Sequence, residues 1–237
     1  MSGHSKWHNI QVRKGKQDAK RAGAFTKLAR IVSIAAKEGG PDPITNFKLR
    51  LAIEKAKQAS MPKENIQRAI YKGTGKGGGE ELFEVIYEGK GPGGIDIIAE
   101  TLTDSKNRTA SEIKHIFTKN GGSIGAPGSS SWNFEQRGYI EAKTEKNPDE
   151  AMLEIMDMGV EDIENENKVL NIYTKPKELA QVSKNLEKKG YKIEKAELIL
   201  DPKNTIKLDE DTSKKALNLL EALDDYDDTQ NVYTNME

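Results

Sequence analysis

The sequence predicts an α+β, multidomain protein, in which an N-terminal three-helix domain is followed by two α/β domains with open sheets. Three observations lead to this prediction. Apolar residues recur at helical spacing up to residue 73, a glycine-rich segment occupies residues 73–79, and a strand-like period begins after it. With 237 residues, the chain is long enough for two or three small domains.

The first domain is predicted to contain three short helices behind a flexible or loosely helical arm at residues 1–17. The first helix begins near Asp18 and ends at Gly39-Gly40, which Pro41 follows. The second covers residues 46–59, and the third runs from Pro62, which fits a first helical turn, to Gly73. Their predicted buried residues are Phe25, Leu28, Val32 and Ala35, then Leu49, Ala52, Ile53 and Ala56, and finally Ile66, Ala69 and Ile70.

The glycine-rich segment GTGKGGG at residues 73–79 contains the pattern G-x-G-x-x-G, which occurs in dinucleotide-binding loops. A phosphate-binding loop of that kind follows a strand and opens a helix. Here the segment follows a helix and precedes a strand, so we interpret it as a linker. Residues 1–79 therefore form the first domain, made of the arm, the helical bundle and the linker.

The second domain begins with a predicted hairpin, whose strands at 83–88 and 95–100 flank GKGPGG. Thr109 and Glu112 form a capping-box pattern that predicts a helix starting there. Two further strands are predicted at residues 131–135 and 138–142.

Residues 148–200 then predict a compact unit that alternates helices and strands. Its helices are expected at 148–158 and 176–189, and its strands near 160–164, 168–173 and 192–200. The last segment predicts a strand at 205–208, a helix at 212–223 and a strand at 231–234. Because these late elements need neighbours, we expect them to return to the first sheet. The second domain is then discontinuous, residues 80–146 plus 203–237, and residues 147–202 are an inserted third domain.

The formal net charge of −1 conceals a strong division along the chain. Residues 1–79 hold 17 Lys and Arg against 5 Asp and Glu, a net charge of +12, whereas residues 80–237 carry −13. Such asymmetry is typical of a basic binding module joined to acidic domains.

The basic module predicts binding to a polyanion, because each lysine or arginine can neutralise a phosphate and release counterions. Trp7 is the candidate for stacking on an exposed base. The predicted nucleic-acid-binding residues are Lys6, Trp7, Arg13, Lys14, Lys16, Lys20, Arg21, Lys27 and Arg30. A generic solvated surface is the alternative, but it does not explain why the excess charge is confined to one segment.

No catalytic constellation emerges from the sequence, so we expect no enzymatic activity and no cofactor or metal. The chain has no cysteine, and His115, between the inward-facing Ile113 and Ile116, is predicted to be a partly exposed surface residue. His4 and His8 have i, i+4 spacing without the glutamate of a zinc-protease motif. The acidic run at residues 224–228 lacks the spaced ligands of a calcium loop, and we interpret it as a solvated acidic turn that can neighbour the basic module.

No apolar run is long enough for a membrane span, and the N-terminus lacks a secretory signal, so we expect a cytoplasmic protein with no membrane partner.

Several long motifs across nearly the whole chain resemble the YebC/PmpR family of transcriptional regulators. They are GHSKW (3–7), RKGKQDAKR (13–21), FTKLAR (25–30), LRLAIEKAK (49–57), MPKENIQRAI (61–70), YEGKGPGG (87–94), LTDSKNRTASEIKHIFTKNGG (102–122) and DDTQNVYTN (227–235). Lys90 stands where the family usually has an aromatic residue, and Ser105 where it usually has asparagine.

This resemblance implies one helical and two α/β domains and a regulator that binds promoter DNA. The family also includes a translational activator of mitochondrial cytochrome oxidase and members linked to the ribosome. DNA is therefore the first predicted partner, and the alternative is a ribosome-associated translation factor that binds ribosomal RNA. Both rest on phosphate recognition, so the sequence leaves the two open.

Overall fold

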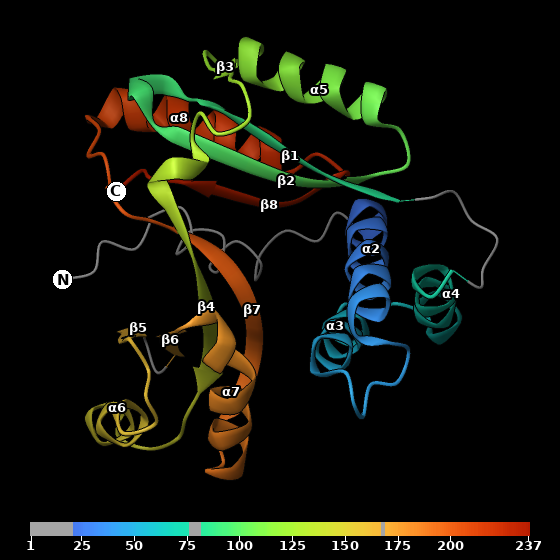
Figure 1. The fold of residues 1–237 in the computed structure, drawn as a ribbon, viewed down its shortest axis with the longest axis vertical. Coiled ribbons are helices and arrows are strands. Elements are labelled where there is room, and N and C mark those ends of the chain that lie inside the picture. The colour runs from blue at the N-terminus through green and yellow to red at the C-terminus, as the bar shows by residue number, and fades with distance from the viewer. Residues whose placement is uncertain (1–20, 76–81, 167–168) are drawn as a thin grey trace.

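The computed structural model of the chain describes residues 21–75, 82–166 and 169–237 (Figure 1). The described part contains a helical module followed by two four-stranded antiparallel sheets with helices packed on them. The predicted α+β class, with three helices before two α/β regions, is confirmed. No helix of the described residues is long and apolar enough to cross a membrane.

The helical module consists of α2 (Arg21–Gly39), α3 (Phe47–Gln58) and α4 (Lys63–Gly73). Val32 and Leu49 are fully buried where the helices meet, as the helical spacing predicted. Asn46 fixes the turn between α2 and α3, because its side-chain oxygen caps α3 at Leu49 N, 3.0 Å away. Its amide nitrogen donates to the carbonyl of Ala35, 2.6 Å away, and so also ties down the end of α2.

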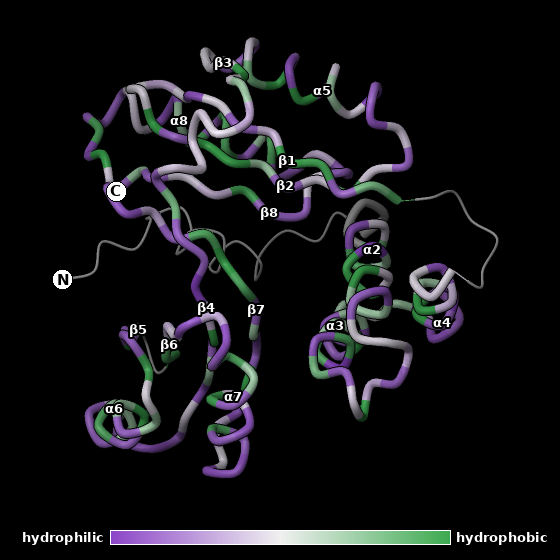
Figure 2. The backbone as a smooth tube through the Cα atoms, viewed as in Figure 1, coloured by the Kyte–Doolittle hydropathy of each residue, from purple (hydrophilic) through white to green (hydrophobic). Residues whose placement is uncertain are grey.

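The first sheet has the strand order β3-β1-β2-β8. Its strands are β1 (Phe83–Lys90), β2 (Asp96–Thr103), β3 (Ser123–Ile124) and β8 (Thr229–Thr234). The helices α5 (Lys106–Lys119) and α8 (Glu210–Asp224) pack on one face of it, and Figure 2 shows hydrophobic positions along β1 and β2 beneath α5. Pairing of β8 with β2 returns the C-terminal segment to the first sheet, as expected. The strand predicted at residues 205–208 is only a single bridge, between Ile206 and Met236.

The capping box predicted at Thr109 is wrong, because α5 begins three residues earlier, at Lys106. Thr109 lies inside the helix with no exposed surface. Its hydroxyl oxygen is 2.6 Å from Asp228 Oδ2 and 2.8 Å from Thr103 Oγ1. The Thr109 hydroxyl, which the capping-box pattern assigned to the start of a helix, therefore forms a buried tertiary hydrogen bond instead.

The second sheet has the order β5-β6-β4-β7. Its strands are β4 (Phe134–Lys143), β5 (Asp162–Glu166), β6 (Val169–Thr174) and β7 (Lys192–Pro202). A hydrophobic core joins it to α6 (Pro148–Met156) and α7 (Leu179–Lys188), and a short 3-10 turn, Pro176–Glu178, precedes α7.

Two strands predicted around Gln136-Arg137 are in fact the single strand β4. Gln136 pairs with Leu200 and Arg137 with Ile199 in a long antiparallel ladder with β7, so the backbone has no break there. The sequence also placed this segment with the first sheet, whereas β4 pairs with β6 and β7 in the second. The limits of the domains as separate folding units stay a prediction.

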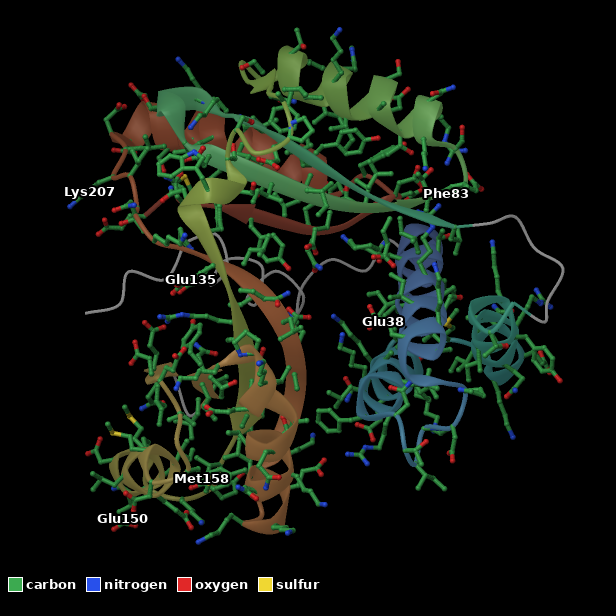
Figure 3. The ribbon with its side chains drawn as sticks, in the orientation of Figure 1. Glu38, Phe83, Glu135, Glu150, Met158 and Lys207 are labelled. Atoms are coloured by element: carbon green, nitrogen blue, oxygen red, sulfur yellow. The ribbon has the colours of Figure 1, made fainter. Side chains whose placement is uncertain are left out.

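The two sheets share a small aromatic cluster, which fixes their relative orientation. The first sheet contributes Ile98 and Tyr233, and the second contributes Phe134, Tyr139, Tyr173 and Ile199. The N-terminal end of α2 points toward the first sheet, and Glu38, near the other end of α2, lies away from it (Figure 3). This arrangement brings the basic helix α2 to the edge of the acidic part of the chain.

Candidate nucleic-acid interface

Two of the nine predicted nucleic-acid-binding residues have described side chains, Lys27 and Arg30. Arg21 is the first residue of α2, and its side chain lies outside the described part. The others also lie outside the described residues: Lys6, Trp7, Arg13, Lys14, Lys16 and Lys20. The described interface therefore consists of the helical module.

Lys27 and Arg30 lie one helical turn apart on α2 and both contact the acidic turn, residues 224–228, which joins α8 to β8. Lys27 Nζ is 2.9 Å from the carbonyl oxygen of Asp224 and 3.3 Å from its carboxylate. Arg30 forms a 2.7 Å ion pair with Asp228 Oδ1 and donates to the carbonyl of Asp227. Both side chains were predicted to contact phosphate, and in the structure both bind oxygens of the chain itself.

Asp228 divides its two carboxylate oxygens between the helical module and the first sheet. Oδ1 forms the ion pair with Arg30. Oδ2 accepts hydrogen bonds from Arg108 at 3.0 Å, from Thr109 at 2.6 Å and from the Tyr226 hydroxyl at 3.1 Å. Burial alone would raise the pKa of Asp228, but the hydrogen bonds from Thr109 and Arg108 and the charge of Arg30 outweigh it and lower the pKa to about 2. Asp228 is therefore a permanent anion at neutral pH.

The interpretation of residues 224–228 as a solvated turn is wrong for Asp228, which is only 2% exposed. Asp225 and Asp227 are exposed, in line with that interpretation. The sequence does place the turn correctly as a neighbour of the basic module. Asp228 can be buried because its charge is paired and hydrogen-bonded on both oxygens.

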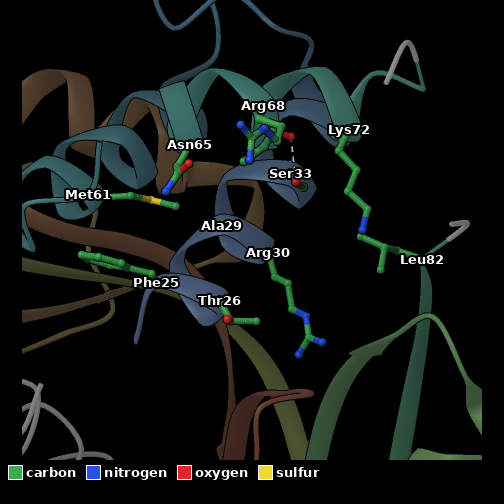
Figure 4. Close-up of a pocket in the computed structure, with 11 residues that line it drawn as sticks. Phe25, Thr26, Ala29, Arg30, Ser33, Met61, Asn65, Arg68, Lys72 and Leu82 are labelled. Carbon is green, nitrogen blue, oxygen red and sulfur yellow. Dashed lines mark hydrogen bonds between the residues drawn. The ribbon is translucent and has the colours of Figure 1, made fainter. Parts of the chain in front are cut away.

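A groove of about 370 Å³ runs between α2 and α4 on the helical module (Figure 4). Its lining is largely apolar, and no carboxylate belongs to it. Three cationic side chains border it, namely Arg30, Arg68 and Lys72. The apolar part consists of Phe25, Ala29, Met61, Ala69 and Leu82.

Close packing of α2 on α4 forms the bottom of this groove. Ser33 Oγ donates to the carbonyl of Ala69 at 2.7 Å, the dashed line in Figure 4. At Gly73 a Cβ atom would come within 2.1 Å of the Ser33 carbonyl oxygen, so only glycine permits this approach. The helix spacing holds the cationic residues of α4 beside those of α2.

Arg68 and Lys72 are exposed and lie at i, i+4 on α4, a spacing that puts them on one face. No carboxylate among the described residues pairs with either side chain, in contrast to Lys48, which pairs with Glu38, and Arg50, which pairs with Glu187. They can therefore contact phosphates without first breaking an ion pair to the described chain. Sequence reasoning missed them as specific contacts, although their spacing on α4 carried the signal.

A second exposed feature that sequence reasoning missed is Trp132, whose surface is 59% exposed. Its indole nitrogen donates to the Ser129 carbonyl at 3.1 Å. The preceding loop is held by the buried carboxylate of Glu88, which accepts hydrogen bonds of 2.7 and 2.8 Å from the backbone N–H groups of Ser130 and Ser131. This loop belongs to the first sheet and lies outside the basic module.

Within residues 21–75, 82–166 and 169–237, no group of three or more His, Cys, Asp or Glu side chains is placed to hold a metal ion. His115 lies on the exposed side of α5, as predicted.

Two family models together match almost the entire chain. The model described as "TACO1/YebC protein N-terminal domain" matches residues 5–76, and "TACO1/YebC second and third domain" matches residues 82–236. The chain belongs to the TACO1/YebC family. The first match covers the helical module, and the second covers both sheets and the acidic turn.

Relatives within the family are similar over their full length. A protein of Caldanaerobacter subterraneus is 52% identical over 239 residues, which cover 100% of this chain and 98% of that protein. One of Lactobacillus acidophilus is 50% identical over 237 residues, which cover 99% and 98% of the two chains. Both are named "Probable transcriptional regulatory protein".

The fold also matches a solved structure. The crystal structure of a conserved hypothetical protein from Aquifex aeolicus has a TM-score of 0.85 and 47% sequence identity to this chain. The match covers 93% of this chain and 91% of the other. The arrangement of helical module and two sheets is therefore one that this relative shares.

Proposed function

We propose that this protein is a cytoplasmic, non-enzymatic regulator of transcription that binds DNA through its basic arm and helical module. The names of its relatives support the regulatory role. The single observation that carries DNA binding is the pair of exposed cations Arg68 and Lys72 at the border of the α2–α4 groove, with which no carboxylate of the described residues pairs. Such side chains position a protein on the phosphate backbone without reading sequence.

The arm would add further phosphate contacts through Lys6, Arg13, Lys14, Lys16 and Lys20. Binding should therefore weaken steeply with salt, by about 0.9 log unit of affinity per log unit of salt for each phosphate contact. Deleting residues 1–20 should remove most of the affinity. Retention of full affinity without the arm would contradict this part of the proposal.

The double variant Arg68→Gln and Lys72→Gln tests the groove. Fluorescence anisotropy with a labelled duplex, repeated from low to physiological salt, should show weaker binding and a salt slope shallower by about two. The matched control is Lys37→Gln with Lys57→Gln, which removes the same charge from exposed positions of α2 and α3 outside the groove lining. Equal losses in both double variants would contradict the groove as the contact.

The same proteins should be tested on ribosomes at near-physiological salt. Tight ribosome binding beside weak, sequence-indifferent binding to DNA would overturn the proposal in favour of a translation factor that contacts ribosomal RNA.

A further inference from the structure

The helical module contacts the rest of the described chain in two chemically different ways. On the α3 side, Phe47 and Leu51 pack against the hydrophobic core of the second sheet, and Arg50 pairs with Glu187 at 2.9 Å. On the α2 side, the ion pairs to the rest of the described chain are those of Lys27 and Arg30 with the acidic turn. The first contact is largely apolar, and the second is ionic.

The acidic turn is held by several contacts that do not involve the helical module. The Asp228 carbonyl accepts from Leu102 N at 2.7 Å. Asp228 Oδ2 accepts hydrogen bonds from Arg108 and Thr109 of α5 and from Tyr226 of the turn itself. The oxygens that face α2 are Asp228 Oδ1, the Asp224 carboxylate and the carbonyls of residues 224 and 227. The turn is thus a preformed array of oxygen acceptors facing two cations.

This array offers Lys27 and Arg30 the same chemistry as a phosphate backbone: anionic oxygens and further acceptors at hydrogen-bond distance. The Lys27–Asp224 pair is partly exposed, with 27% and 28% of the two side chains accessible. Partly exposed pairs contribute little and are screened by salt. A polyanion that also binds elsewhere on the module can therefore compete for Lys27. The Arg30–Asp228 pair is more buried, with 16% and 3% of the two side chains accessible, so Arg30 leaves Asp228 only for another anion that takes its place, such as a phosphate.

We propose that the acidic turn is an intramolecular competitor of nucleic-acid phosphate. In the free protein it holds Lys27 and Arg30, and DNA that is bound at Arg68 and Lys72 displaces it. The α2 side of the module then separates from the first sheet, while the apolar contact of Phe47 with the second sheet stays in place as the hinge. This inference rests on the proposed DNA-binding function. It adds a mechanism by which the acidic turn lowers the affinity for DNA.

The first test compares two neighbouring acidic residues of the turn. Asp224→Asn removes the carboxylate that pairs with Lys27, and Asp225→Asn removes the same charge from an exposed position with no ion pair to the described part of α2. Asp224→Asn should tighten binding to duplex DNA about two- to five-fold relative to Asp225→Asn. Equal tightening in both variants would show a long-range field effect and overturn the inference, as would no tightening in Asp224→Asn.

The second test needs no DNA and uses the absence of cysteine in the chain. Spin labels at Lys37→Cys and Lys215→Cys report the distance between α2 and α8, and labels at Lys57→Cys and Lys188→Cys report that between α3 and α7. All four positions are exposed. Raising salt from 0.05 to 1 M should broaden the first distance distribution and leave the second unchanged.

The two tests separate failure of the competitor from failure of the proposed function. If no duplex binds but salt still broadens the α2–α8 distances, the ionic contact opens as inferred and the DNA proposal fails. If duplex binds while neither salt nor duplex changes the α2–α8 distances, the competitor is wrong and DNA binding stands.

Discussion

Asp228→Asn should destabilise the protein more than any other substitution in the acidic turn. The amide keeps the shape of the carboxylate but removes the charge that faces Arg30 at 2.7 Å and Arg108 at 3.0 Å. Arg30 then lies in a site where only 16% of its side chain is accessible, without its counter-ion. Removing one partner of a buried ion pair leaves the other charge uncompensated.

The magnitude follows from the lowered pKa of Asp228. Its pKa falls from an ordinary 3.8 to about 2, which corresponds to about 2.5 kcal/mol of stability at neutral pH. Because the folded pKa is below the unfolded one, this contribution is complete above the unfolded pKa. It is lost as the pH falls from about 4 toward 2. We therefore expect Asp228→Asn to cost about 2 to 3 kcal/mol at pH 7 and progressively less below pH 4.

Urea unfolding followed by far-ultraviolet circular dichroism, at pH values from about 7 down to 3, measures this cost. The control is Asp225→Asn, an exposed residue of the same turn, which should change stability by less than about 0.5 kcal/mol. A cost below about 0.5 kcal/mol for Asp228→Asn would refute the reasoning. So would a difference from the native protein that does not shrink as the pH falls.

Three further substitutions test close packing and hydrogen bonds in the helical module and in the two sheets. Gly138→Ala would place a Cβ atom 2.3 Å from Thr174 Oγ1 in the second sheet, so calorimetry should show a loss of about 1 to 3 kcal/mol; an unchanged melting temperature would contradict this. Glu88→Gln removes a charged acceptor of backbone N–H groups, and hydrogen exchange at Ser130 should become about 5- to 30-fold faster, whereas unaltered exchange would mean that the loop is held otherwise. Asn46→Ala removes both the cap of α3 and the hydrogen bond to the Ala35 carbonyl of α2. The free energy of unfolding in urea should fall by about 1 to 3 kcal/mol. A smaller loss would mean that backbone hydrogen bonds, and not the Asn46 side chain, hold this turn.

The sequence predicts the elements of this fold well where periodicity is strong. Val32 and Leu49, placed inward by helical spacing, are fully buried, and the last strand returns to the first sheet. The prediction fails where a side chain bonds to a residue that is distant in the sequence. Thr109 resembles a helix cap, but its hydroxyl is committed to Asp228, and no local pattern encodes that contact.

The candidate site divides in the same way. Net charge identified the basic module, and Lys27 and Arg30 were predicted to bind nucleic acid as part of it. The partner of Lys27, Asp224, lies 197 residues away along the chain, and Arg30 pairs with Asp228 of the same turn, so only the tertiary fold could reveal the pairing. Arg68 and Lys72 were accessible to sequence reasoning through their i, i+4 spacing, but spacing does not tell a paired cation from an unpaired one.

The opposite charges of the two parts of the chain therefore have two distinct consequences. At Lys27 and Arg30 the acidic part neutralises the basic part internally, which stabilises the contact between α2 and the first sheet. At Arg68 and Lys72, where no carboxylate of the described residues intervenes, positive charge faces outward. A polyanion approaching the described module meets Arg68 and Lys72 of α4 without displacing an ion pair, and it gains Lys27 and Arg30 of α2 only by replacing the acidic turn. Affinity for DNA should then depend on the acidic turn as well as on the basic residues, because each carboxylate removed from contact with α2 lowers the cost of that exchange.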